Sequence, residues 1–349
     1  MIRLASRLAC GSAAALLLVT LPLAAQNPPP PSVRITGVGY LQYLYQVKDT
    51  ANHQNEFDVT RAYVNVLGGF GELATRITAD VFGSGTSLGY RLKYAFAAYT
   101  PKGSPVTYRF GLMTTPWIDW EETLWDYRMQ GPVTLDRNGY MSSSDIGVGA
   151  DGNFNNELVD LQVLAFNGEG YGSAATPGDQ RKDVAGRVSL RVLATDDASK
   201  VGGLRLSAYG QYGKPTGGGE RIRLIGMVSY RSKMLTLAAE GGLTRDSSTA
   251  TPTALRQGQV ISGYGVLHFA GKAAVIGRLD YVKPDKNAAS TDPGYTNTRV
   301  IGGVSYQLTP NLRVLGDVDY LSYANGTPAA PAGLDAKRAQ ALFQAQFTF

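Results

Sequence analysis

The chain has 349 residues, of which 44% are hydrophobic and 17% charged, with 42 Gly, 20 Tyr and a formal net charge of +5 at pH 7. This composition is too polar for a bundle of membrane helices, and its only Cys, Cys10, excludes an internal disulfide or a thiolate metal site. The basic residues are spread singly along the chain, which argues against nucleic-acid binding.

The N-terminal segment is typical of a cleaved secretory signal. Arg3 and Arg7 precede an apolar run over residues 13–23, and small residues follow it up to Ala25. The run is too short for a permanent membrane helix, which needs about 20 residues. We therefore expect a signal peptide over 1–25, a Pro-rich periplasmic leader over 26–32 and a folded domain over 33–349.

Two-residue alternation of apolar and polar side chains recurs along the folded domain and predicts strands. Most of these predicted strands are close in length to the ~9 to 11 residues that a tilted membrane strand needs. The predicted strands lie near 33–47, 57–68, 72–82, 89–100, 105–113, 144–152, 157–167, 182–194, 202–212, 220–231, 233–244, 258–270, 272–283, 295–307, 311–323 and 337–349.

Short and long connections alternate between these strands. The short turns lie at 68–71, 101–104, 152–156, 231–233, 270–272 and 308–310, and the link 195–201 is longer than its class. The long loops lie near 48–56, 83–88, 113–143, 168–181, 213–219, 245–257, 284–294 and 324–336. The pattern predicts an all-β, transmembrane antiparallel up-and-down β-barrel of about 16 strands, with 14 and 18 as alternatives.

The last strand ends on an aromatic residue. Ala341, Phe343, Ala345, Phe347 and Phe349 share one face, and polar residues share the other. A strand of this kind resembles the closing strand of Gram-negative outer-membrane barrels, whose assembly machinery reads the terminal residue. We expect Phe349 to be that assembly signal and the barrel to lie in the outer membrane; the alternative is the buried last strand of a soluble sandwich.

The same alternation separates an outer from an inner face. In the strand over 89–100, Tyr90, Leu92, Tyr94 and Phe96 are predicted to face outward, with the basic residues between them facing inward. An Arg at the midplane of the lipid face costs about 2 to 4 kcal/mol, so charge is assigned to the lumen. The predicted pore-lining basic residues are Arg61, Arg76, Arg91, Lys93, Arg109, Arg187, Arg191, Arg205, Arg223, Arg278, Arg299 and Arg313.

Acidic residues predicted to face inward are fewer, which predicts a net positive wall that concentrates anions. They are Asp58, Asp80, Glu240, Asp280, Asp317 and Asp319. The alternative is that each Arg pairs with a lumen acid and only holds the barrel interior together.

The longest connection, 113–143, holds all three Trp of the chain. As the third long loop it is expected to fold into the lumen, bury its rings against the wall and set its acids opposite wall arginines. Its candidate residues are Trp117, Asp119, Trp120, Glu121, Glu122, Trp125, Asp126 and Arg128. The alternative is an external contact surface or a trimer latch.

The segments 57–64, 68–73 and 108–117, followed by Glu121 and Glu122, resemble the phosphate-selective porin O and P family. That family has an aromatic followed by basic residues in its second strand, and a Gly-Gln-Phe-Lys-Thr-Pro-Phe type segment that enters the constriction loop. Here Leu112, Met113 and Thr114 stand where the family tends to have Gln, Phe and Lys. The resemblance implies a trimeric, water-filled porin.

The sequence therefore predicts a passive diffusion channel for small hydrophilic solutes with anion preference, phosphate included. Its expected partners are the lipid bilayer, the barrel-assembly machinery and two further copies in a homotrimer, with no nucleic acid, metal or other cofactor. His53 and His268 have no nearby nucleophile setting, which argues against an enzyme. A plugged structural or adhesion barrel and a sugar-specific channel are the alternative hypotheses.

Overall fold

The computed structural model describes residues 30–49, 53–84, 87–172, 181–215, 218–248, 254–269, 271–286, 295–326 and 335–349. The predicted signal peptide over 1–25 and most of the predicted leader over 26–32 lie outside these residues. Within the described residues, no helix is long and apolar enough to cross a membrane.

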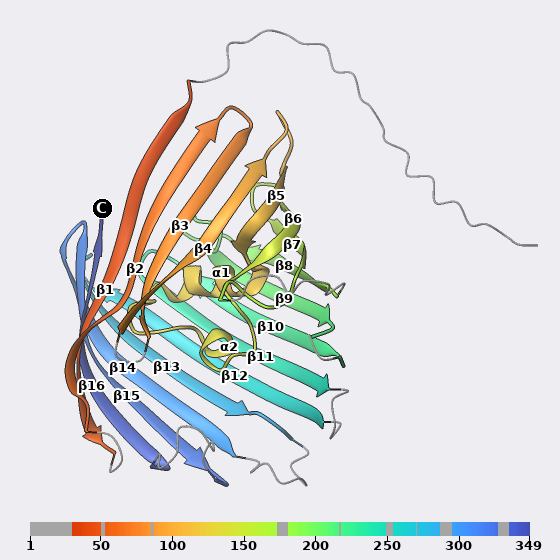
Figure 1. Cartoon of the computed structure of the whole chain (residues 1–349). Coiled ribbons are helices and arrows are strands. Elements are labelled where there is room, and N and C mark those ends of the chain that lie inside the picture. The colour runs from red at the N-terminus through yellow and green to blue at the C-terminus, as the bar shows by residue number, and fades with distance from the viewer. Residues whose placement is uncertain are drawn as a thin grey trace, which may run out of the picture.

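Sixteen antiparallel strands form one closed barrel, in which each strand pairs with its chain neighbours and β1 pairs with β16 (Figure 1). This confirms the predicted all-β up-and-down barrel. The strands are β1 Ser32–Lys48, β2 Asn55–Phe70, β3 Leu73–Ser84, β4 Ser87–Tyr99, β5 Val106–Thr114, β6 Ser144–Phe154, β7 Val159–Phe166, β8 Asp183–Leu193, β9 Gly203–Gly213, β10 Arg221–Arg231, β11 Leu235–Ser248, β12 Ala254–Phe269, β13 Ala273–Lys283, β14 Thr296–Thr309, β15 Leu312–Ala324 and β16 Lys337–Thr348.

The start of β1 and the end of β16 lie at the same end of the barrel as the short turns. Val38 of β1 is opposite Thr348, and the backbones of Gly37 and Phe349 exchange two hydrogen bonds of 2.9 and 3.1 Å. The long connections lie at the opposite end, and they include the connection between β5 and β6 that carries both helices. We call these the turn end and the loop end.

The predicted strand boundaries differ most at β11 and β12. Each is four residues longer than predicted at the loop end: β11 ends at Ser248 and β12 begins at Ala254. The extension is paired throughout, with Arg245 opposite Gln257 and Asp246 opposite Arg256. Polar residues there resemble a loop in sequence, but the partner strand supplies their hydrogen bonds.

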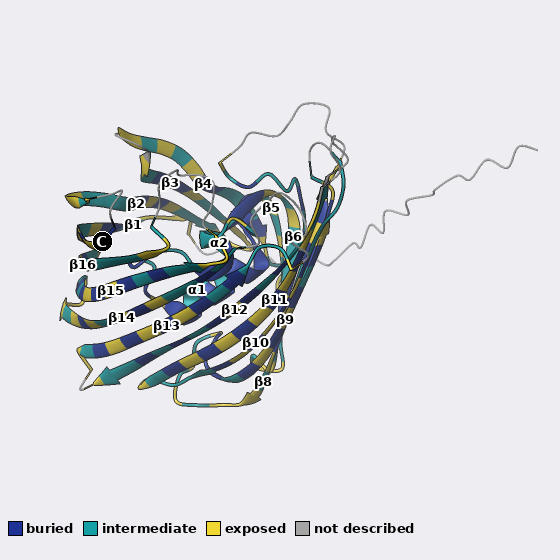
Figure 2. Cartoon of the chain, turned by 90° about the horizontal axis from the view of Figure 1, so that it is seen from below, coloured by how far each residue is buried: buried dark blue, intermediate teal, exposed yellow. Residues whose placement is uncertain are grey.

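Apolar side chains cover the outside of the barrel and polar side chains line much of the inside. Phe110, Val184 and Val304 are 68, 57 and 60% exposed, whereas the intervening inward residues are buried in stripes along the strands (Figure 2). The buried apolar core gathers around two helices within the ring of strands, α1 (Pro116–Trp125) and α2 (Thr134–Arg137) (Figure 1).

The alternation predicted for 89–100 is wrong from Tyr94 onward. Thr78 of β3 is opposite Tyr94, and the next residue, Ala79, is opposite Leu92, so Lys93 is an extra residue that forms a β-bulge. The bulge reverses the faces beyond it. Lys93 and Tyr94 are therefore both buried, at 4 and 7% exposure, while Tyr90 remains 77% exposed.

Candidate functional site

Residues 115–143, here called the inner loop, turn inward from the end of β5. Pro116 occupies the first turn of α1, where its missing N–H costs nothing, and the Thr115 hydroxyl donates to the backbone carbonyl of Ser142 at the return of the loop. The helix ends at Asp126, whose φ of 53° is left-handed and whose N–H donates to the Glu122 carbonyl. Both ends of α1 are thus fixed by the loop itself.

One face of α1 packs against the inner side of β7–β12. Trp117, Trp120, Leu124 and Trp125 are at most 1% exposed, and the helix contacts β7, β8, β11 and β12. The indole Nε1 of Trp117 donates to Glu240 Oε2 at 3.1 Å. The positions recur at helical spacing, which gives α1 one buried face and one face toward the lumen.

Trp120 is covered by wall arginines. Arg187 Cζ lies 4.0 Å and Arg205 Cζ 5.5 Å from the ring, within the range of a cation–π interaction. Arg187 also donates from Nε to the Pro116 carbonyl at 2.9 Å and forms an ion pair with Asp160. These contacts join α1 to β7, β8 and β9.

Two carboxyl groups meet behind α1. Both side-chain oxygens of Glu121, and Glu240 Oε1, are buried and receive no hydrogen bond from a donor among the described residues. One proton shared between the two carboxyls would satisfy them. Burial and the neighbouring Glu240 raise the pKa of Glu121 well above its ordinary value.

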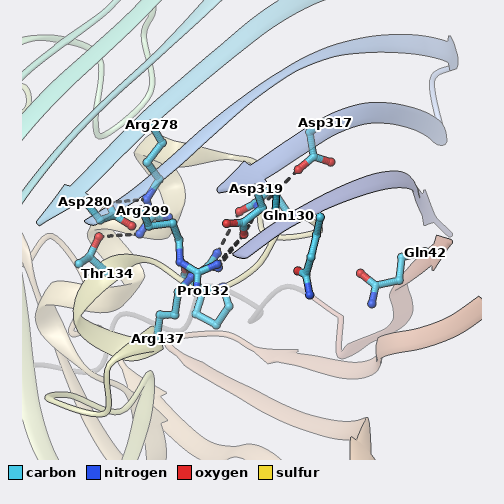
Figure 3. Close-up of polar contacts among 12 residues, drawn as sticks. Gln42, Gln130, Pro132, Thr134, Arg137, Arg278, Asp280, Arg299, Asp317 and Asp319 are labelled. Carbon is cyan, nitrogen blue, oxygen red and sulfur yellow. Dashed lines mark hydrogen bonds and ion pairs between the residues drawn. The ribbon is translucent and has the colours of Figure 1, made fainter. Parts of the chain in front are cut away.

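The second half of the inner loop is held by a polar cluster on β13–β15 (Figure 3). Arg278 donates from Nη1 to the Pro132 carbonyl at 3.1 Å and from Nη2 to Thr134 Oγ1 at 2.6 Å, and it pairs with Asp280 at 2.9 Å. Asp319 binds Arg299 at 2.6 Å and Arg137 of α2 at 3.4 Å. The inner loop is therefore anchored at both of its helices.

The opposite face of α1 borders a cavity of about 260 Å³, here called the α1 cavity. Across it lie β1–β4 and the end of β16, with the rings of Tyr40, Tyr63 and Tyr94 on that side. The charged residues that line it are Arg76, Lys93, Arg128, Asp119, Glu122 and Asp126. Acids of the inner loop thus face cations of β3 and β4.

Each acid of the α1 cavity has a cation partner. Glu122 pairs with Arg128 at 2.8 Å, Asp126 with Arg313 at 3.1 Å, and Asp119 with Lys200 at 3.1 Å. Burial opposes the ionisation of Asp119, but Lys200 outweighs it, so the pKa of Asp119 lies below its ordinary value.

Arg76 and Lys93 form no ion pair among the described residues. Arg76 donates to Asn65 Oδ1 at 3.0 Å and lies 4.4 Å above the Tyr94 ring. Lys93 Nζ lies 3.3 Å from the Tyr63 hydroxyl and 4.6 Å from the Tyr63 ring centre. Neutral groups therefore hold these two cations, and their charge is not cancelled locally.

The other ten predicted wall cations each have a carboxylate partner. Arg191 lies near the turn end, at 3.9 Å from Glu157, and Arg205 reaches the same carboxylate. The pairs are Arg61–Asp80, Arg91–Asp80, Arg109–Asp151, Arg187–Asp160, Arg191–Glu157, Arg205–Glu157, Arg223–Asp246, Arg278–Asp280, Arg299–Asp319 and Arg313–Asp126.

The link between β8 and β9 supplies contacts that the sequence reasoning did not identify. Besides Lys200, Asp197 pairs at 2.7 Å with Arg231, whose Nη1 donates to the Thr123 carbonyl near the end of α1 at 2.6 Å. The unusual length of this link was the available signal. Arg137 was also missed, because its partner Asp319 lies far along the chain on β15, and so was the contact of Tyr63 with Lys93 on β4.

No protein-family model matches the chain, and no curated protein matches it either. Solved structures do. The anion-selective porin from Comamonas acidovorans matches with a TM-score of 0.67 and 13% identity, covering 92% of this chain and 100% of its own.

Two further channels give similar values. DcaP, an outer membrane channel of Acinetobacter baumannii, has a TM-score of 0.63 and 12% identity, with 91% of this chain and 97% of its own covered. OmpF of Salmonella typhi has a TM-score of 0.65 and 11% identity at the same coverage. The narrower resemblance to the phosphate-selective porin O and P family stays a prediction. The chain has the barrel fold of outer-membrane porins.

Proposed function

We propose that this protein is an outer-membrane porin that lets small hydrophilic solutes diffuse passively and prefers anions. The inner loop narrows the lumen, and solutes pass through the α1 cavity between the acids of α1 and the cations of β3 and β4. The barrel fold shared with solved porins supports the general function. The proposal includes a homotrimer, and OmpT of Vibrio cholerae is a solved similar barrel in a trimer form.

The observation that carries the anion preference is the uncompensated charge of Arg76 and Lys93. Every acid that lines the α1 cavity has a cation partner, whereas these two cations have no carboxylate. An anion that enters meets two positive charges held by Tyr63, Tyr94 and Asn65. Because water remains in the cavity the attraction is weak, so the anion can leave again.

The ten paired cations have a different proposed role. Their charge is balanced at short range by wall acids, so they hold neighbouring strands and the inner loop in place and contribute less to selectivity. We therefore assign anion selectivity to Arg76 and Lys93. Arg91 pairs with Asp80 and Arg109 with Asp151, so these two arginines should contribute less.

Reversal potentials in planar bilayers test the proposal. A unit positive charge about 4 Å from a passing ion attracts chloride and repels potassium by about 1 kcal/mol each in water, so Arg76→Gln or Lys93→Gln should each lower the chloride-to-potassium permeability ratio about thirtyfold. Arg34→Gln is the matched control, since it removes one exposed cation near the turn end, outside the α1 cavity. An equal shift in all three variants would refute the assignment to this cavity.

The same recordings separate the alternatives. A folded barrel without conductance would be the plugged structural or adhesion barrel. Tyr40, Tyr63 and Tyr94 line the α1 cavity, so block of the current by maltotriose would indicate a sugar-specific channel. Saturable block of the chloride current by inorganic phosphate would extend the proposal to the phosphate selectivity that the family resemblance implies.

A further inference from the structure

A second and larger cavity, of about 520 Å³, lies at the loop end of the barrel, between residues 138–142 of the inner loop and strands β6, β7 and β9–β12. We call it the loop-end cavity. Its charges balance, since Arg221, Arg223 and Arg256 stand against Asp145, Glu169 and Asp246. Rings of Tyr140, Phe166 and Tyr209 also line it. It differs from the α1 cavity, where Arg76 and Lys93 have no carboxylate partner because the acids there pair with Arg128, Lys200 and Arg313.

Arg221 presents one unoccupied edge. Its Nη1 donates to the Gly168 carbonyl at 2.8 Å and to Asp183 Oδ2 at 3.0 Å, which fixes the guanidinium. Its Nε and Nη2 make no hydrogen bond among the described residues, and the side chain remains 22% exposed. Nε and Nη2 form the planar fork that binds a carboxylate through two parallel hydrogen bonds.

Glu169 lines the same cavity and is one residue after Gly168, whose carbonyl Arg221 binds. The N–H groups of Gly168 and Gly170, on either side of it, both donate to Asp145 Oδ2 at 3.1 and 2.8 Å. The turn that carries Glu169 is therefore held in place. Glu169 Oε2 is shielded from solvent, yet no donor among the described residues reaches it. A buried carboxylate oxygen without a donor is costly, so the Glu169 carboxylate gains by turning toward a cationic group in the cavity.

Arg223 does not compete for the ligand. Its Nε donates to the Tyr140 carbonyl at 3.0 Å and its Nη2 to Asp246 at 2.8 Å, so it positions the inner loop and neutralises Asp246. Asp145 is likewise occupied by the backbone. The groups left for a ligand are the Arg221 fork, the Glu169 carboxylate and the neighbouring rings.

We propose that the loop-end cavity binds a zwitterion of the α-amino-acid class, with its carboxylate on the Arg221 fork, its ammonium on Glu169 and its side chain against Tyr140 and Phe166. The two charged groups of an α-amino acid share one carbon, and Arg221 binds the carbonyl of the residue before Glu169, so the two side chains start from neighbouring points of one cavity wall. The volume lies within the range of small-molecule sites. The site would concentrate such solutes before they reach the α1 cavity.

Isothermal titration of the purified full-length protein in detergent tests the site without relying on conductance. L-Phenylalanine should bind with saturable heat, and 3-phenylpropanoate and 2-phenylethylamine, which each lack one charged group, should bind at least tenfold more weakly. Glu169→Gln should weaken L-phenylalanine about tenfold or more and leave 3-phenylpropanoate unchanged or stronger. Arg221→Lys, which keeps the charge but loses the fork, should weaken both ligands.

Glu56→Gln, an exposed position on β2 outside the cavity, is the matched control and should bind as the unmodified protein does. No saturable heat up to the solubility limit of L-phenylalanine would overturn the proposal, as would equal effects of Glu169→Gln and Glu56→Gln. A barrel that binds L-phenylalanine but does not conduct would refute the porin function and leave this site standing.

Discussion

Replacing Trp120 tests whether the inner loop is held against the wall by its aromatic face. Trp120→Ala removes a side chain that is 1% exposed and lies 4.0 Å from Arg187. Large-to-small changes of this kind cost about 3 to 5 kcal/mol, of which the desolvated cation–π contact accounts for up to about 2. The equilibrium between docked and undocked loop should therefore shift about 150- to 5,000-fold toward the undocked state.

The loss should be visible in single-channel recordings and by limited proteolysis. Current noise should rise, and trypsin should cleave after Arg128 in the inner loop, while strand content stays the same because no ladder hydrogen bond involves Trp120. Trp120→Phe is the control, since it keeps an aromatic ring beneath Arg187. Unchanged noise and unchanged protease resistance in Trp120→Ala would refute the view that this face anchors the loop.

Three further predictions concern single groups. The pKa of Glu121 is raised in the folded protein, so the stability that its protonated form contributes is complete below the unfolded pKa of about 4.3 and is lost as pH rises above that value. Glu121→Gln should therefore flatten the decline of the unfolding temperature between pH 5 and pH 9. An unchanged slope would count against the shared proton. Lys200→Met should change the free energy of unfolding by no more than about 1 kcal/mol, because the side chains of Lys200 and Asp119 are 44 and 35% exposed. The variant should shift the reversal potential toward cation selectivity, because it leaves the charge of Asp119 without its partner. An unchanged reversal potential would place Asp119 outside the ion path. Phe349→Ala should lower the fraction of folded barrel in outer membranes, measured by heat-modifiable mobility, while refolding in detergent stays normal, and normal assembly in cells would remove the role of Phe349 as a signal.

Most of the barrel could be predicted because its information is local. Alternation with a period of two, interrupted by turn residues, is written into each strand, and the count of sixteen strands followed from it. The bulge at Lys93 could not be predicted, because the register between β3 and β4 produces it and Tyr94 has the character of an outward residue. An apolar ring suits either face of a porin strand.

The inner loop could be predicted as a unit but not in its pairings. Its Trp residues and its length distinguish it from the other connections, whereas many of its polar partners on the wall lie more than a hundred positions away. Trp117 meets Glu240, and Arg137 meets Asp319, across sequence separations of 123 and 182 residues. The sequence shows how many arginines face inward but not which of them are neutralised, and selectivity depends on that difference.

The pairing of β1 with β16 has a consequence for how the barrel forms. Every other strand pair joins chain neighbours and can assemble as a local hairpin, but the contact of Gln46 with Ala339 joins residues 293 positions apart. Closing a loop of that length in an unstructured chain costs about 5 kcal/mol of entropy.

The inner side of this seam carries glutamines that bridge it. Gln340 donates to Gln46 at 2.9 Å and Gln344 to Gln42 at 3.2 Å, and Gln344 also donates to the Met129 carbonyl of the inner loop at 2.8 Å. A one-residue slip of β16 would turn these amides outward and break all three bonds. The seam should therefore be the last pairing to form, and its amides select one register and couple barrel closure to the docking of the inner loop.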